Sequence, residues 1–187
     1  MPNLQKQKIR AIMKQKRNAL EKHDIEKFSK QICEKLFTLK IFDFDNFFIY
    51  KSFGSEVETD QIISKLFKLK KRIFTPKILK NDMKSVEILQ NTVFFKNKIG
   101  ILEPDGEFLE INNFVAIMPC LAVSKTGNRI GFGGGFYDRF LQNIDALKIV
   151  VCYDFQVVQE FEPEQNDIPV DIVVTEKRVI YCKENQK

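Results

Sequence analysis

The 187-residue sequence is poor in the side chains that build metal centres and catalytic triads. It has one histidine, no tryptophan and four cysteines. A centre made of several histidines is therefore excluded, and a serine-type triad could use only His23. The cysteines, Cys33, Cys120, Cys152 and Cys182, are far apart with no C-x-x-C pair. This argues against a zinc site and a disulfide framework, so we expect a protein of a reducing compartment, the cytoplasm.

Long hydrophobic runs are also missing. No apolar stretch approaches the roughly 20 residues that span a bilayer, and the lysine-rich N-terminus lacks the apolar core of a signal peptide. We therefore expect a soluble protein without membrane attachment. Hydrophobic residues make up 44% and charged residues 29% of the chain, which is ordinary for a globular protein. The length fits one domain, residues 1–187.

Positive charge is concentrated at the N-terminus. Residues 1–22 hold seven lysines and arginines against one acid, Glu21, so this segment carries +6 of a net +5 and the remainder sums to −1. Such a segment indicates an anionic partner, which could be nucleic acid, a membrane surface or a small phosphorylated or carboxylated ligand. A solvated face of an ordinary helix is the alternative.

Two helices are predicted first. Residues 4–20 fit a helix with one apolar stripe and one basic stripe at three- and four-residue spacing. The apolar stripe contains Ile9, Ile12, Met13 and Leu20, and the basic stripe contains Lys6, Arg10, Lys14 and Arg17. A second helix is expected to begin at Asp24 as its N-cap.

The rest of the chain alternates between short apolar runs, typical of buried strands, and helical patterns. Strands are predicted at 47–50, 72–75, 86–89, 114–118, 149–152 and 172–174, with an edge strand at 179–181. Pro76 is expected to end the second strand, Thr59 to cap a helix, and a further helix to cover 134–144. This predicts an α/β fold with a mainly parallel sheet covered on both faces, and a ligand site beyond the carboxyl ends of its strands.

The strongest motif lies between a predicted strand and this last helix. Five of the eight glycines fall within residues 127–135, and Arg129 adds a positive charge. Glycines allow a close backbone approach, and free N–H groups at a helix start favour an anion, so the segment indicates a phosphate cradle. A glycine-rich connection without a ligand is the alternative. The dinucleotide and P-loop motifs do not fit, because Phe136 replaces a required glycine and no Gly-Lys-Ser/Thr follows.

Several acids are candidates for metal or proton chemistry. Asp138 could bind a metal that bridges phosphates, or simply complement the first turn of a helix. Asp167 and Asp171 could supply a further metal oxygen, or belong to a turn. Residues 52–59 follow the first buried strand, where a carboxylate can orient a polar ring or accept a proton, although Glu58 equally fits a position before a helix. Residues 100–104 are interpreted as a rigid turn.

In their order along the chain, these segments resemble the 5-formyltetrahydrofolate cyclo-ligase family, also called 5,10-methenyltetrahydrofolate synthetase. The resemblance covers nearly the whole chain. It is carried by the basic helix with Arg10 and Arg17, then by residues 56–59, 100–104 and 118–122, the glycine segment ending in 136–139, and residues 167–171.

The resemblance implies a three-layer α/β/α fold similar to that of sugar-phosphate isomerases and CoA transferases. It also implies a ligase reaction in which ATP and 5-formyltetrahydrofolate give 5,10-methenyltetrahydrofolate, ADP and phosphate, with Mg²⁺ as cofactor. These two small molecules are then the expected partners, with neither nucleic acid nor membrane, and the protein is expected to be a monomer or weak homodimer.

Site residues follow from the same resemblance. The ATP-binding positions are Lys6, Arg10, Arg129, Ile130, Gly131, Phe132, Gly133, Gly134, Gly135, Phe136 and Tyr137. The folate-binding positions are Lys51, Glu56, Phe132, Gly133, Gly134, Gly135 and Phe136. Asp138 and Asp167 are implied to hold magnesium, and Glu56, Arg129 and Asp138 to be catalytic.

Three positions depart from the family pattern. Phe136 stands where many relatives have tyrosine, Ser124 where aspartate is frequent, and Lys51 where less charged residues are usual. Two other functions stay open on the residues alone. One is an isomerase or CoA-transferase-like activity on the same fold, which would need no ATP. The other is nucleic-acid binding through the basic helix, which would depend strongly on salt.

Overall fold

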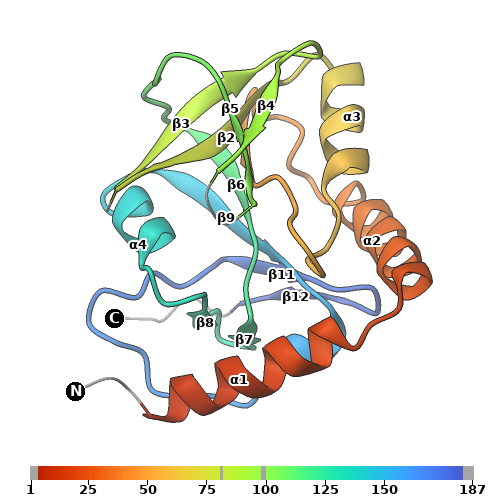
Figure 1. Ribbon diagram of the computed structural model, residues 1–187, viewed down its shortest axis with the longest axis vertical. Helices are drawn as coiled ribbons and strands as arrows, with labels where there is room; N and C mark the ends of the chain where they lie inside the picture. The colour runs from red at the N-terminus through yellow and green to blue at the C-terminus, as the bar shows by residue number, and fades with distance from the viewer. Residues whose placement is uncertain (1–3, 81, 98–99, 183–187) are drawn as a thin grey trace.

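A seven-stranded sheet forms the centre of the computed structural model, which describes residues 4–80, 82–97 and 100–182 (Figure 1). Its strand order is β12-β11-β9-β6-β1-β2-β3. The two edge pairs, β2 with β3 and β11 with β12, are antiparallel, and the pairs between them are parallel. The predicted mainly parallel α/β sheet is confirmed.

The helices are α1 (Leu4–Asn18), α2 (Lys22–Leu36), α3 (Asp60–Lys68) and α4 (Phe136–Leu141), with a short 3-10 helix η1 (Asp154–Gln156). The strands of the main sheet are β1 (Asn46–Ile49), β2 (Arg72–Leu79), β3 (Asp82–Ile88), β6 (Phe114–Met118), β9 (Ala146–Val151), β11 (Ile172–Val174) and β12 (Val179–Tyr181). A three-stranded sheet contains β7 (Ala122–Ser124), β8 (Arg129–Ile130) and β10 (Val157–Val158), and β4 (Phe94–Lys96) pairs with β5 (Leu102–Pro104).

Alternation along the buried strands divides the core between the two faces of the sheet. Phe47 and Ile49 of β1 belong to the cluster that α2 and α3 cover, whereas Phe48 belongs to the cluster that contains Leu141 of α4. Successive side chains of a strand point to opposite faces, so an uninterrupted apolar run is what a sheet covered on both sides requires. The helices and the sheet therefore form three layers (Figure 1).

Several local predictions were wrong. β2 runs through Pro76 to Leu79, because β1 pairs only with its first three residues and leaves Pro76 where a missing N–H is tolerated. α2 begins two residues before Asp24, which lies in its first turn. The helix expected over 134–144 is only the six residues of α4. Residues 102–104 form β5 instead of a turn.

α1 lies outside these layers, along one end of the sheet and beside β7 (Figure 1). Met13 joins a small cluster with Ala122, Ile130 and Phe161, whereas Ile12 of the predicted apolar stripe is exposed. Within the described part of the chain, none of the helices has both the length and the apolar character that a membrane crossing needs.

Candidate functional site

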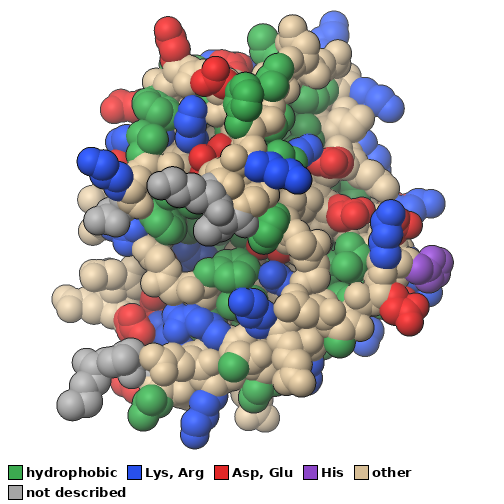
Figure 2. Space-filling model, viewed as in Figure 1, with side chains coloured by type: hydrophobic (Ala, Val, Ile, Leu, Met, Phe, Trp, Pro, Cys, Tyr) green, Lys and Arg blue, Asp and Glu red, His purple; other side chains and the backbone are tan. Residues whose placement is uncertain are grey.

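A cavity of about 580 Å³ lies beyond the carboxyl ends of β1 and β6, as expected for an α/β sheet. Helix α1 and the strands β2, β3 and β5 contribute to its walls. The other contributions come from the segment that follows β1, from the glycine segment, and from the loop that holds Glu164 and Asp167. Figure 2 shows basic and hydrophobic side chains gathered around a hollow on this face of the molecule, above α1. Segments distant in sequence thus share one site.

The basic stripe of α1 faces this cavity. Lys6 and Arg17 are 2% and 5% exposed, far less than lysine and arginine usually are. Lys6 pairs closely with Asp167 and lies 3.4 Å from the Glu164 carboxylate. Arg10 Nε donates a 2.9 Å hydrogen bond to the carbonyl of Gly131. Lys6 and Arg17 are therefore not part of a solvated face, whereas Lys14 of the same stripe is exposed.

The glycine segment joins β8 to α4 and contributes residues 131–138 to the cavity wall. Gly133 has a φ of +101°, a region that L-residues rarely adopt, and a Cβ built there would stand 3.9 Å from the Arg10 guanidinium carbon. The segment is thus shaped against α1. Because α4 is only one and a half turns long, its dipole is weaker than the sequence suggested, and the surrounding cations must carry more of any anion binding.

Arg129 and Asp138 form a partly buried ion pair in this wall. Arg129 Nη1 lies 2.9 Å from Asp138 Oδ1, and the same oxygen accepts a 3.1 Å hydrogen bond from the Ile168 amide. The guanidinium of Arg129 also stands 5.8 Å from the centre of the Tyr137 ring. Asp138 is therefore more than a first-turn acid, since it links α4 to the loop that carries Asp167.

The other two predicted acids, Asp167 and Asp171, differ in whether they line the cavity. Asp167 lines the cavity, where Lys6 pairs with its Oδ2 and the Glu164 amide donates to the same oxygen at 2.8 Å. Asp171 instead accepts a 2.7 Å hydrogen bond from the Lys148 amide, outside the cavity wall. Among the described residues, no group of three or more acids, histidines and cysteines could hold a metal ion by itself.

Glu56 lines the same cavity from the segment after β1. The residue is 8% exposed, its Oε2 accepts a 3.0 Å hydrogen bond from the Phe53 amide, and its Oε1 lies 3.9 Å from Arg17 Nη1. Burial raises the pKa of this carboxyl above its ordinary value, while Arg17 and the Phe53 amide act in the opposite direction. Glu56 is thus a desolvated acceptor aimed at the cavity.

The remaining predicted positions lie in three settings. Lys51 lines the cavity but pairs with Asp60 and stands 5.4 Å from the centre of the Phe94 ring. Ile130 packs in the small cluster against α1 and does not line the cavity. Ser124 is fully buried, and its Oγ forms a 2.9 Å hydrogen bond with Thr126 Oγ1. Ser124 also lies outside the cavity wall, so its departure from the family pattern leaves the cavity unchanged.

A family model for the 5-formyltetrahydrofolate cyclo-ligase family matches residues 2–176. The chain belongs to this family. It is 32% identical to the 5-formyltetrahydrofolate cyclo-ligase of Haemophilus influenzae, over 89% of this chain and 92% of that protein. It is 27% identical to the Escherichia coli K12 enzyme of the same name, over 90% and 98% of the two chains.

Solved structures agree with this membership. The NMR structure of Aquifex aeolicus 5,10-methenyltetrahydrofolate synthetase matches with a TM-score of 0.83 and 27% identity, covering 97% of this chain and 95% of that one. The Mycoplasma pneumoniae 5,10-methenyltetrahydrofolate synthetase has the same fold, with a TM-score of 0.73 at 21% identity. The three-layer arrangement is therefore the fold of these cyclo-ligase family members.

Sequence reasoning missed part of the cavity wall of this family member. Arg17, Tyr50 and Glu103 line it without having been assigned a role, together with an apolar strip formed by Ile78, Met83, Ile101 and Leu102. Arg17 could have been found, since it follows Arg10 by seven residues on the same helix face. The apolar strip could not, because its members come from β2, β3 and the segment 101–102 at the start of β5, whose pairing the sequence pattern does not specify.

Proposed function

We propose that this protein catalyses the ATP-dependent cyclisation of 5-formyltetrahydrofolate to 5,10-methenyltetrahydrofolate, with release of ADP and phosphate. Family membership supports the activity. The observation that carries the proposal is that the glycine segment, the cations of α1 and the buried Glu56 all line the same cavity. Its volume of about 580 Å³ is in the range of small-molecule sites.

The ATP phosphates are assigned to the end formed by Lys6, Arg10, Arg129 and residues 131–137. Phosphoryl transfer requires positioning and charge neutralisation more than a protein nucleophile. Arg129 is held by Asp138, so its guanidinium is fixed before the nucleotide arrives. The carbonyl of Gly131 orients Arg10 in the same way. Ile130 does not contact the nucleotide itself; it packs in the small apolar cluster and so anchors the glycine segment to the core.

The residues present fit a magnesium ion. Asp138 and Asp167 both line the cavity, and each engages one carboxylate oxygen in the contacts described above, which leaves its second oxygen for another ligand. Magnesium in proteins is commonly held by one or two carboxylates together with substrate phosphates and water, so two acids suffice. When bound, the ion would neutralise charge on the transferring phosphoryl group.

The folate is assigned to the end that contains Glu56 and Phe132, with Lys51 and residues 133–136 beside it. The pterin ring presents neighbouring N–H donors, and a carboxylate can accept two of them at once. Phe136 keeps an aromatic ring at a position where many relatives have tyrosine, and Gly134 lies directly against that ring. Glu56 therefore orients the pterin, and Phe132 offers it an exposed aromatic face.

The substrates supply both nucleophiles. The formyl oxygen attacks the γ-phosphorus, and the bond to the bridging oxygen breaks as ADP leaves with its electron pair. N10 then attacks the activated formyl carbon, its proton passes to the departing phosphate, and the carbon–oxygen bond breaks to release that phosphate as the ring closes. Arg129 and Lys6 lie where negative charge accumulates during the first step. A sequence with a single histidine, exposed on α2, is adequate for this chemistry.

We further propose that the protein acts in the cytoplasm as a monomer or weak homodimer. The residues assigned to both substrates line one cavity of a single chain. The four cysteines are all free thiols in the structure, as expected in a reducing compartment.

The test is formation of the methenyl product, followed by its absorbance near the ultraviolet–visible boundary after protein, MgATP and 5-formyltetrahydrofolate are mixed. We expect product only when ATP and the divalent cation are both present. Turnover without ATP would favour an isomerase-like reaction, and the absence of product from folded protein under complete conditions would refute the proposed function.

A further inference from the structure

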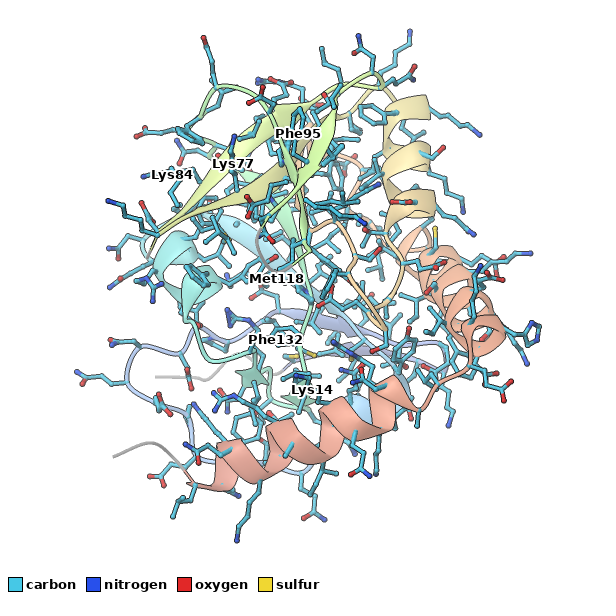
Figure 3. The ribbon with its side chains drawn as sticks, viewed as in Figure 1. Lys14, Lys77, Lys84, Phe95, Met118 and Phe132 are labelled. Carbon is cyan, nitrogen blue, oxygen red and sulfur yellow. The ribbon has the colours of Figure 1, made fainter. Side chains whose placement is uncertain are left out.

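Arg17 makes three contacts that join the two walls of the folate end. Its Nε donates to Ser55 Oγ at 3.2 Å, its Nη1 lies 3.9 Å from Glu56 Oε1, and its guanidinium carbon stands 5.3 Å from the centre of the Phe132 ring. Figure 3 shows Phe132 projecting from the segment between β8 and α4, above the helix that carries Lys14. One planar cation therefore contacts both the pterin-binding acid and the aromatic side chain of the glycine segment.

The surroundings of Glu56 make the charge of Arg17 important. Glu56 interacts electrostatically with Arg17 of α1 and with three tyrosines from other elements. These are Tyr50 directly after β1, Tyr137 of α4 and Tyr153 in the segment after β9. Burial raises the pKa of all three tyrosines above the ordinary value, so they remain neutral at physiological pH. Arg17 then supplies the positive charge that favours an ionised Glu56.

We propose that Arg17 is a positioning residue for the folate, which keeps the buried Glu56 ionised and holds Phe132 against the same site. This inference rests on the proposed function. Arg17 acts through Glu56 and Phe132, because its contacts are with these two residues and with Ser55. Its effects should therefore fall on folate binding and its pH dependence, and not on the use of ATP.

Replacement of Arg17 removes an opposite charge about 4 Å from Glu56, which raises the pKa of that carboxyl further. In Arg17→Met, the acidic limb of kcat/KM for 5-formyltetrahydrofolate should move to higher pH by about one unit, and the folate KM at neutral pH should rise about tenfold. The ATP KM should stay within twofold of the wild-type value.

Two further variants separate charge from packing. Arg17→Lys keeps the positive charge but loses the planar group over Phe132, so it should restore the acidic limb while recovering only part of the folate KM. Lys16→Met removes one positive charge from the neighbouring, exposed position of α1, which does not line the cavity, and should leave the whole profile unchanged. Thermal melting identifies any variant that fails to fold, and Arg17→Gln replaces Arg17→Met in that case.

Calorimetry gives a readout that does not require turnover. 5-Formyltetrahydrofolate is titrated at a pH on the acidic limb of the wild-type profile into protein loaded with Mg²⁺ and a non-hydrolysable ATP analogue, in two buffers of different ionisation enthalpy. The variant Arg17→Met should release more protons on binding than the wild type, because Glu56 is partly protonated in the free variant and ionised in the complex.

An unmoved acidic limb with unchanged proton release in Arg17→Met would overturn the role of Arg17, as would an equal loss of folate and ATP affinity. The kinetic measurements require an active wild-type protein, whereas the measurement of proton release does not. Failure of the wild type to form product would instead count against the proposed function, so the two failures are distinguishable.

Discussion

At the end of the cavity proposed for phosphate, Arg129 and Asp138 stand 2.9 Å apart and share further hydrogen bonds with the Ile168 backbone. At the end proposed for folate, Arg17 and Glu56 are separated by 3.9 Å. The first pair is a fixed structure that a nucleotide can meet without rearrangement. The second leaves a desolvated carboxylate that is only partly compensated, and the pKa of Glu56 is raised as a result. The two ends should therefore fail differently when altered.

The largest effect is expected at the phosphate end. Arg129→Gln should lower kcat at least about a thousandfold, because an arginine that neutralises charge on a transferring phosphoryl group typically contributes that much. Single-turnover product formation measures this loss. The exposed Arg72, which pairs with Glu87 at 2.7 Å and lies outside the cavity, provides the control Arg72→Gln. Comparable rates in both variants would remove Arg129 from the phosphate site.

A smaller and more selective loss is expected for Glu56→Gln. The amide has one acceptor oxygen and no charge, so the folate KM should rise about thirtyfold, or about 2 kcal/mol for a charged hydrogen bond, while the ATP KM is retained. Steady-state kinetics with each substrate varied in turn checks this. Equal changes in the two constants would contradict the division of the cavity into two ends.

The sign of the pH dependence follows from the raised pKa of Glu56. The folded protein binds this proton more readily than the unfolded chain does. The contribution of Glu56 to the free energy of unfolding therefore declines as the pH rises from the ordinary glutamate range through the raised value. Folate binding changes in the opposite sense, because it gains the ionised acceptor over the same interval. In Glu56→Gln both dependences should disappear.

An intermediate effect is expected from two glycines with positive φ. Gly133→Ala strains the cavity wall and should raise the ATP KM about tenfold. At Gly127, outside the cavity, a Cβ would stand 2.3 Å from the Val170 carbonyl oxygen, so Gly127→Ala should lower Tm by about 4–8 °C and affect KM little. Thermal melting and ATP kinetics on both variants test the contrast, and matching profiles would refute it.

The smallest effect is expected for Lys51→Gln. Lys51 is already engaged by Asp60 and lies over Phe94, on a partly exposed rim where ion pairs contribute little. The folate KM should change less than about threefold. A change as large as that in Glu56→Gln would show that Lys51 leaves Asp60 to contact the substrate.

The sequence predicts the central sheet well because its buried strands are uninterrupted apolar runs, as at Phe114–Met118. It fails where partners decide the structure. From the sequence, Pro76 is expected to end its strand. In the structure β1 is too short to pair with Pro76, so the missing N–H of this proline breaks no hydrogen bond on that side. The two- and three-residue strands β7, β8 and β10 have no pattern of their own, and they form because neighbouring segments supply hydrogen-bond partners.

The candidate site shows the same division. Residue types identify Arg129 and Asp138, but their ion pair depends on how β8 and α4 are turned toward each other. The basic stripe of α1 is visible as a pattern, whereas the burial of Lys6 and Arg17 follows from acids about 160 and 39 positions away in the sequence, Asp167 and Glu56. Long-range pairing of this kind is not encoded in local periodicity.

The way α1 is attached has a consequence for how the molecule comes apart. Its buried residues are one methionine and two cations, Lys6 and Arg17, so polar contacts hold much of this helix to the rest of the chain. A helix with so few buried apolar contacts belongs to the elements that open locally at low free energy, unlike the apolar core under α2 and α3. Helix α1 would then detach while the sheet is still intact, and it would remove four of the six lysines and arginines that line the cavity at once. Amide hydrogen exchange in α1 would be a sensitive reporter of cavity occupancy.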